Sequence, residues 1–342
     1  MQETQPIPVG GASFKRATYE GGPTAAHHFE IAVPGTFRSA EAAGVVDPGQ
    51  MSWPSSPFVP MATFVDDQDP GFQLEVGLAE LSRDVNAGDF GELDAAARGT
   101  RVVQRRDADP WQGCHSELIV HGGTVDAPVV ERIRGLKDGT RLFRVACVSP
   151  KAAYDGRAEV IARSIRSFRL LAPTGEAAAE PIRTHQTGGR SGWSFGVPAY
   201  WTRSDPAQSD GAVLLRPSAT HRYDLWTEVR ELAEGESLES GLRGYAAVMR
   251  SRGLRLVGAP ICAANPPPGF DEFRYYSPPA QARGLHHQPT VMALRRADRS
   301  VLCGVCGPAR HDAAWAWALC KRSAETVVRT LAPIQPPAHG LC

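Results

Sequence analysis

The chain has 342 residues, with 37 lysines plus arginines and 37 aspartates plus glutamates, so its formal net charge is zero. This length is typical of two domains of about 150 residues, each with its own core. Without excess charge, neither nucleic acid nor an anionic membrane is expected as a partner. No apolar run reaches the roughly 18 residues of a membrane span, and the first residues lack the basic and apolar regions of a secretory signal. The sequence predicts a cytoplasmic protein, with a periplasmic or envelope protein whose signal peptide was removed as the alternative.

The first half of the chain predicts strands with one short helix among them and a longer helix at the end. Phe29, Ile31 and Val33 recur at the period of a strand with one buried face, which Pro34-Gly35 ends. Residues 38–60 are rich in glycine, proline and serine and indicate a long irregular insert. Further strands are expected at 61–65, 72–81, 117–120, 129–136 and 142–148, a short helix with an aspartate cap at 89–98, and an amphipathic helix after Pro150.

The second half predicts the same plan. Strands are expected at 193–197, 212–216, 223–232, 254–259, 270–276, 288–295 and 300–306, and helices at 237–252 and 313–331. Residues 174–190, rich in alanine, glycine and threonine, indicate a linker between the halves. The expected organisation is a first domain at 1–173, a second domain at 191–334 and a tail at 335–342.

Three landmarks recur in the same order in both halves, which predicts a duplicated domain. The opening strand with Phe29 matches the one with Trp193. Val145 to Pro150 matches Cys303 to Pro308, and Leu171-Ala172-Pro173 matches Leu331-Ala332-Pro333. Strands and helices in this order predict two similar α+β domains, each an antiparallel sheet with helices packed on it.

Both halves carry an opening strand that ends in Val-Pro, followed by an aromatic residue. These are Val33-Pro34-Gly35-Thr36-Phe37 and Val197-Pro198-Ala199-Tyr200-Trp201, and the first terminal helix ends in Ile165-Arg166-Ser167-Phe168. With the late hairpin, strand, proline and terminal helix, this pattern resembles the PsbP-like superfamily, which also contains the DcrB-like bacterial proteins. The resemblance covers most of both halves through short motifs, but the insert at 38–60 and the short middle helix depart from it. No binding surface is therefore carried over to the first half.

The resemblance implies a noncatalytic role in binding or assembly. One branch of the superfamily, the Eag-type chaperones of type VI secretion, uses a pair of such domains to shield apolar segments of effectors in the cytoplasm. A tandem copy within one chain suits that arrangement. No serine-nucleophile motif, phosphate-binding loop or dinucleotide fingerprint occurs, which disfavours an enzyme.

Cys303 and Cys306 are the strongest candidates for a metal or redox site, with His311 nearby in sequence. They fall in a predicted strand, where residues three positions apart face opposite sides. The residues are therefore expected to be small core side chains, and neither a metal nor another cofactor is predicted. Seven cysteines are an odd and sparse set, so most thiols are expected to be reduced.

Aromatic side chains on predicted loops and strand edges are the candidate binding residues: Trp53, Trp111, Phe270, Tyr275 and Tyr276. Such aromatic rims mark partner surfaces, but they also cover sheet edges and core ends, and the sequence leaves both interpretations open. The leading hypothesis is a noncatalytic adaptor or chaperone that binds an apolar or amphipathic protein segment, such as one of a secretion effector. The alternatives are a structural component of the cell envelope or of a secretion apparatus, and a metal or redox protein that uses Cys303 and Cys306. The oligomeric state stays open.

Overall fold

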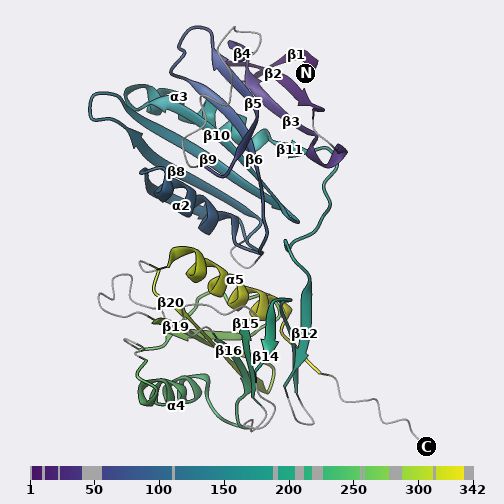
Figure 1. Ribbon diagram of the computed structural model, residues 1–342, viewed down its shortest axis with the longest axis vertical. Helices are drawn as coiled ribbons and strands as arrows, with labels where there is room; N and C mark the ends of the chain where they lie inside the picture. The colour runs from purple at the N-terminus through teal and green to yellow at the C-terminus, as the bar shows by residue number, and fades with distance from the viewer. Residues whose placement is uncertain are drawn as a thin grey trace, which may run out of the picture. The chain divides into compact units, whose positions relative to one another are not determined.

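The computed structural model describes residues 2–9, 12–21, 24–40, 56–109, 112–187, 192–204, 212–217, 226–254, 256, 259–276, 287–310 and 313–334. The chain divides into two compact units, unit 1 (Met1–Ala179) and unit 2 (Glu180–Cys342), as Figure 1 shows. The boundary falls inside the predicted linker. None of the helices in the described part of the chain is long and apolar enough to cross a bilayer.

Unit 1 is built on a seven-stranded sheet in the order β4-β5-β6-β10-β9-β8-β7, and a smaller sheet in the order β1-β2-β3-β11 accompanies it. All strand pairs are antiparallel. The strands are β1 (Gln2–Val9), β2 (Ala12–Tyr19), β3 (Phe29–Pro34), β4 (Phe37–Ser39), β5 (Val59–Asp66), β6 (Gln73–Glu80), β7 (Arg101–Asp107), β8 (His115–Gly123), β9 (Pro128–Asp138), β10 (Arg141–Pro150) and β11 (Arg169–Leu170); the helices are α2 (Ala87–Ala97) and α3 (Lys151–Ser167), with a 3-10 turn at Ala25–His27.

The two helices of unit 1 cover opposite faces of the large sheet. Phe143 and Val145 on β10 pack with Ile161 and Ile165 of α3 in the main core. Ala146 points to the other face and packs in a smaller cluster under α2. Because side chains alternate along a strand, β10 supplies both cores.

Unit 2 has its own seven-stranded sheet, in the order β14-β15-β16-β20-β19-β18-β17, and a three-stranded sheet in the order β12-β13-β21. The strands are β12 (Ile182–Gln186), β13 (Trp193–Pro198), β14 (Trp201–Arg203), β15 (Val213–Pro217), β16 (Trp226–Glu231), β17 (Ile261–Cys262), β18 (Glu272–Tyr276), β19 (His287–Arg296), β20 (Arg299–Pro308) and β21 (Ala332–Pro333); the helices are α4 (Leu238–Ser251) and α5 (Ala314–Thr330). Helix α4 packs against β18 to β20, and α5 packs against β13 and β20.

The two large sheets have the same strand order, element for element, so the expected pair of similar α+β domains is confirmed. The third sequence landmark, however, was matched three residues out of register. In unit 1, Arg169 pairs with Glu30 of the opening strand β3. In unit 2, Ala332 pairs with Ser194, the equivalent residue of the opening strand β13. Leu171-Ala172-Pro173 therefore lies three residues beyond the structural equivalent of Leu331-Ala332-Pro333.

Several predicted element boundaries differ from the structure. The short helix begins after Asn86, whose side chain accepts a hydrogen bond from the Gly88 N–H, and Asp89 lies within its first turn instead of capping it. The predicted linker contains strand β12, which pairs with β13, because its backbone completes the edge of the small sheet. Residues 41–55 of the predicted insert lie outside the described residues, but 56–60 do not: Phe58 is buried and β5 begins at Val59.

Candidate functional site

The two units differ in chemistry at the same edge of their large sheets. In unit 1, Glu117 on β8 is paired with Arg106 on β7 and with Arg134 on β9. In unit 2, Tyr275 on β18 is paired with Ile261 on β17 and with Met292 on β19. Equivalent strands therefore carry charged side chains in unit 1 and apolar ones in unit 2, at positions that the fold places next to one another.

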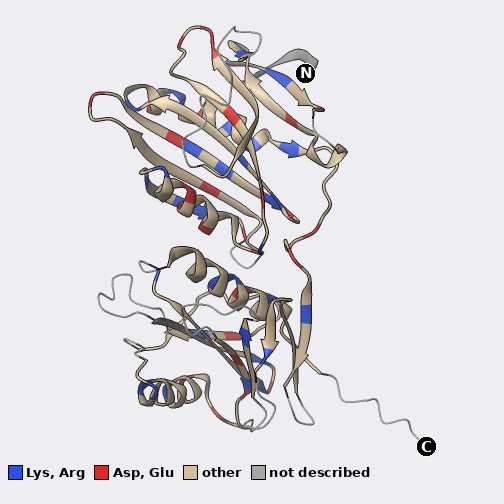
Figure 2. Cartoon of the chain, in the orientation of Figure 1, with Lys and Arg blue, Asp and Glu red and all other residues tan. Residues whose placement is uncertain are grey.

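The charged face of unit 1 forms an open groove of about 560 Å³. Its lining includes Arg106, Asp107, His115, Glu117, Arg134 and Arg166. Figure 2 shows basic and acidic residues close together on the strands of this sheet. The volume lies within the range of about 300–1,000 Å³ that is usual for ligand pockets.

Glu117 is held at this groove by two arginines. Arg132 Nε donates to Glu117 Oε1 at 2.6 Å, and Arg166 Nε and Nη2 donate to Glu117 Oε2 at 3.0 and 2.9 Å. Burial raises the pKa of Glu117, but the hydrogen bonds and charges of these arginines outweigh burial, so its pKa lies below the ordinary value. Glu117 is therefore an ionised and already neutralised carboxylate.

Arg134 ties the groove to the end of α3. Its Nη1 donates to the carbonyl oxygens of Arg166 and Phe168, at 2.7 and 3.2 Å, where the last turn of a helix leaves carbonyls unsatisfied. Burial lowers the pKa of Arg134, with Glu117 opposing the shift and Arg166 adding to it. Burial and the neighbouring Arg134 likewise lower the pKa of His115, so this histidine is neutral at pH 7.

Arg106 and Arg166 are the exposed arginines of the groove lining. Arg106 lies on β7. The Gln104 amide is oriented with its oxygen toward Arg106, and this oxygen accepts hydrogen bonds from Arg106 Nε and Nη2 at 2.9 and 3.0 Å. A side-chain amide leaves the guanidinium charge uncompensated. Among the described residues, no carboxylate pairs with Arg106.

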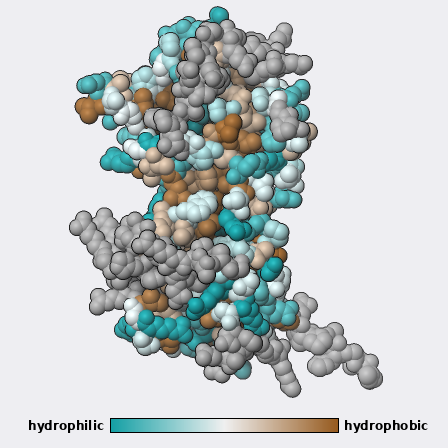
Figure 3. Space-filling view, in the orientation of Figure 1, coloured by the Kyte–Doolittle hydropathy of each residue, from teal (hydrophilic) through white to brown (hydrophobic). Residues whose placement is uncertain are grey.

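The corresponding edge of unit 2 is apolar and partly accessible. Ile261 is 44% exposed on β17, a strand of only two residues, and Tyr275 is half-buried. The ring of Tyr275 stacks on Phe273 at 5.3 Å between ring centroids, and Phe273 and Met292 are buried. Elsewhere in the described chain, large exposed apolar residues such as Val125 and Leu171 occur singly, and Figure 3 shows hydrophobic and hydrophilic residues interspersed on the visible face.

A buried network of charges lies on the α2 face of unit 1. Arg98 Nε donates to Asp94 Oδ2 at 2.9 Å, and Arg98 Nη1 to Glu131 Oε2 at 2.8 Å. Arg144 bridges Glu131 and Glu75, the latter at 2.8 Å. Burial raises the pKa of Glu75, with Arg144 opposing that shift. The members bind one another beneath the helix, so the network joins α2 to the sheet.

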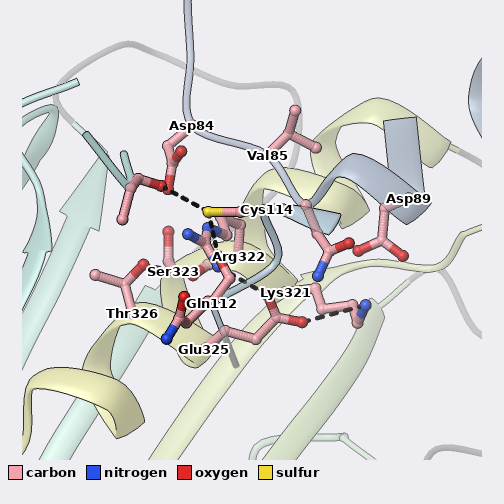
Figure 4. A network of polar contacts seen from close by, with 12 residues as sticks. Asp84, Val85, Asp89, Gln112, Cys114, Lys321, Arg322, Ser323, Glu325 and Thr326 are labelled. Carbon is pink, nitrogen blue, oxygen red and sulfur yellow. Dashed lines mark hydrogen bonds and ion pairs between the residues drawn. The ribbon is translucent and has the colours of Figure 1, made fainter. Parts of the chain in front are cut away.

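On α5 of unit 2, Lys321 and Arg322 both pair with Glu325 of the same helix. Lys321 Nζ lies 3.2 Å from Glu325 Oε1, and Arg322 Nη1 donates to Glu325 Oε2 at 3.4 Å, as Figure 4 shows. These pairs connect residues three and four positions apart on the helix surface. They stabilise the helix and do not form a ligand site by themselves.

The structure separates the five aromatic candidates. Trp53 and Trp111 lie outside the described residues. Phe270 is buried and stacks on Trp193 with 6.2 Å between ring centroids, and Tyr276 is buried in the core under α4, so of the two interpretations that the sequence left open, both residues fit the covering of core ends. Tyr275 and Tyr276 are adjacent on β18, so their side chains face opposite sides of the strand, and Tyr276 faces the core. Tyr275 keeps its place at the partly accessible edge.

Cys303 and Cys306 point to opposite faces of β20, as their spacing predicts. Cys306 belongs to the core under α4, whereas residues 303, 305 and 307 face the other side, where Gly307 contacts Cys320 of α5. Burial raises the pKa of the Cys303 thiol to about 12, so it stays protonated at neutral pH. His311 lies outside the described residues, and within the described part no three His, Cys, Asp or Glu side chains are grouped to hold a metal ion.

No known protein family matches this sequence, and no curated protein sequence is similar to it. Similar solved structures include the cyanobacterial PsbP protein CyanoP from Synechocystis, which is 16% identical over 47% of this chain and 95% of CyanoP, with a TM-score of 0.33. The Ran-binding protein Mog1p from Saccharomyces cerevisiae is 13% identical over 47% of this chain and 96% of Mog1p, with a TM-score of 0.35. A protein from Bacteroides thetaiotaomicron is 11% identical over 46% of this chain and 48% of its own, with a TM-score of 0.26.

Each of these similarities spans about half of the chain. At identities of 11–16% and TM-scores of 0.26–0.35, they carry no argument about partners.

Proposed function

We propose that this chain is a noncatalytic adaptor or chaperone that binds an extended apolar or amphipathic segment of a protein partner along the β17 edge of unit 2. The observation that carries the proposal is the exposed Ile261 on the edge strand, next to the half-buried Tyr275 on the neighbouring strand. An edge strand offers free backbone N–H and C=O groups, and adjacent apolar side chains add specificity to a strand that pairs with it.

The equivalent edge of unit 1 shows how such an edge is normally protected. Strand β7 carries Arg101, Arg105 and Arg106, and its register with β8 shifts between Val102 and Gln104. Charged side chains and bulges are the devices that prevent edge pairing in natural sheets. Strand β17 consists of Ile261 and Cys262, both exposed, and its pairing with β18 is regular. Of the two edges, that of unit 2 is the one suited to a partner strand.

The charged side chains described above support a noncatalytic role. In the α2 network and around Glu117, carboxylates and guanidinium groups bind one another in stable pairs, and the buried thiol of Cys303 stays protonated. In its specific form, the proposal is that the partner is a secretion effector, the client implied by the resemblance to Eag-type chaperones.

The test uses a fluorescein-labelled peptide of alternating leucine and lysine, and a peptide of the same composition in which the leucines are grouped. Fluorescence anisotropy with the full chain is expected to show binding of the alternating peptide, because alternation places all leucines on one side of an extended segment. Ile261→Asp should weaken this binding at least tenfold. Val125→Asp, which makes the same change at a 97% exposed valine of unit 1, should leave it unchanged. Equal binding to both variants would exclude the β17 edge.

A further inference from the structure

The groove of unit 1 has a chemistry that the β17 edge lacks. We propose that Arg106, Arg134 and Arg166 form a binding site for the carboxylate groups of an acidic protein segment. This site belongs to unit 1 and is independent of the function proposed for the β17 edge of unit 2.

The charge balance of the groove is the first argument. Four arginines, at positions 106, 132, 134 and 166, lie around a single paired carboxylate, Glu117. The other carboxylate of the lining, Asp107, is bound to Arg105 at 2.6 Å. The local excess of positive charge therefore persists after every ion pair of the groove has been counted, although the whole chain has a formal net charge of zero.

Free hydrogen-bond donors are the second argument. Arg134 donates three hydrogen bonds within the described chain, all from Nη1. Its Nε and Nη2 groups can therefore donate to a ligand. Within the described part of the chain, Arg106 hydrogen-bonds only to the Gln104 amide, and it is exposed. A guanidinium presents parallel N–H groups in a planar fork that matches the two oxygens of a carboxylate.

The duplication supplies an internal control for this interpretation. The positions of Arg106, Glu117 and Arg134 correspond to Ile261, Tyr275 and Met292 in unit 2, where the same sheet forms with apolar side chains. The fold thus does not require charges at these positions. Arg134 and Arg166 also have partners within the fold, at the end of α3 and at Glu117, but Arg106 is exposed and pairs with no carboxylate of the described chain, so the fold does not explain its charge.

The spread of the arginines favours several carboxylates over a single phosphate. Arg106, Arg134 and Arg166 come from three elements, β7, β9 and α3, so a ligand that reaches all of them needs anionic groups at several positions. The volume of about 560 Å³ admits more than a single acidic side chain. A segment with several glutamates or aspartates, spread over neighbouring positions, therefore suits the groove best.

The test measures binding of the full chain to a fluorescein-labelled Gly-Ser peptide that carries four glutamates, and to its glutamine counterpart, by fluorescence anisotropy. We expect the glutamate peptide to bind at least tenfold more tightly, and its affinity to fall as the salt concentration rises from 50 to 500 mM. Arg106→Glu should weaken binding at least tenfold. Glu117→Gln, which removes the competing carboxylate from Arg132 and Arg166, should strengthen it severalfold.

Arg243→Glu is the matched control, because Arg243 is an exposed arginine on α4 of unit 2 and its replacement changes the total charge by the same amount. It should leave the affinity unchanged. The proposal is overturned if Arg243→Glu weakens binding as much as Arg106→Glu, or if the glutamine peptide binds as tightly. It is also overturned if inorganic phosphate displaces the peptide at a lower concentration than glutarate does, since the groove would then be a phosphate site.

Discussion

Ser167 and Thr330 occupy the same position in the two units, and each joins the closing helix to the opening strand. Each is the last residue of its helix, α3 or α5, and its side-chain oxygen accepts a 2.7 Å hydrogen bond from a backbone N–H, that of Ala32 for Ser167 and that of Gly196 for Thr330. Each hydroxyl also donates to a carbonyl of its own helix. Both copies have thus kept this hydrogen bond between the closing helix and the opening strand, whereas the side chains at their sheet edges have diverged.

Removing either hydroxyl should destabilise its own unit. Ser167→Ala and Thr330→Val leave a strand N–H without its partner, which costs about 1–2 kcal/mol of unfolding free energy in urea titrations. Ser251→Ala is the control, because the exposed Ser251 at the end of α4 donates to the Val248 carbonyl but accepts no strand N–H. We expect a cost below about 0.5 kcal/mol for that variant. A similar loss in all three variants would show that the bond to the strand contributes nothing.

The close approach of α4 to β20 requires a glycine at position 304. A Cβ atom there would lie 2.5 Å from the hydroxyl of Tyr245 and 3.0 Å from its ring, and Tyr245 is fixed by burial and by its 2.8 Å hydrogen bond to Glu228. Gly304→Ala should therefore destabilise unit 2 by about 1–3 kcal/mol.

Gly244, on α4 itself, is the matched control for this steric argument. A Cβ at that position meets no atom within 4 Å, so Gly244→Ala should stabilise the helix by about 0.5–1 kcal/mol. The measurement is the urea midpoint of each variant. Shifts of the same sign would contradict the close contact between Tyr245 and β20.

The sequence revealed the duplication because the buried opening strands kept their spacing: Phe29, Ile31 and Val33 correspond to Trp193, Phe195 and Val197 in both alternation and burial. Sequence identity gave the wrong alignment where no buried side chains fix the register. The Leu-Ala-Pro triplets that close the two halves agree in sequence but not in register, because the residues after the helix pair with the opening strand through backbone atoms alone.

The groove of unit 1 was not foreseen, although its signal was present. His115 and Glu117 on β8, and Arg132 and Arg134 on β9, are spaced two apart, which places each pair on one face of its strand. Their meeting depends on the register between strands, which a single sequence does not fix. The adjacent pair Tyr275-Tyr276 does not show in sequence which side chain faces the core, and the structure buries Tyr276.

The buried carboxyl of Glu75 should make stability depend on pH. Burial raises its pKa above the ordinary 4.5, so the folded state binds this proton more tightly than the unfolded state does. The contribution of Glu75 is then fully present below pH 4.5 and is lost as the pH rises through the raised value. Glu75→Gln, which carries no titrating group, should become more stable relative to the natural chain as the pH rises from 4 to 7.

Glu117→Gln is the control of opposite sign for Glu75. Because the pKa of Glu117 is lowered, its contribution is present above pH 4.5 and is lost as the pH falls, so this variant should become less stable relative to the natural chain as the pH rises. Urea unfolding at pH 4, 5, 6 and 7 measures both differences. Parallel trends in the two variants would contradict the assignment.

The thiols of unit 2 should differ sharply in reactivity. Cys262 is exposed on β17, whereas Cys303 is buried on β20 with its pKa raised to about 12, so a reagent can reach the Cys262 sulfur while the Cys303 thiol is covered and stays protonated. Brief treatment of the native chain with a maleimide, followed by peptide mapping, should find Cys262 labelled and Cys303 and Cys306 unlabelled. All three should react in urea, and Cys262→Ser should leave the other two unlabelled in the native state. Native labelling of Cys303 at the rate of Cys262 would contradict its burial, and stoichiometric zinc that is lost on replacing either Cys303 or Cys306 would contradict their placement on opposite faces of the strand.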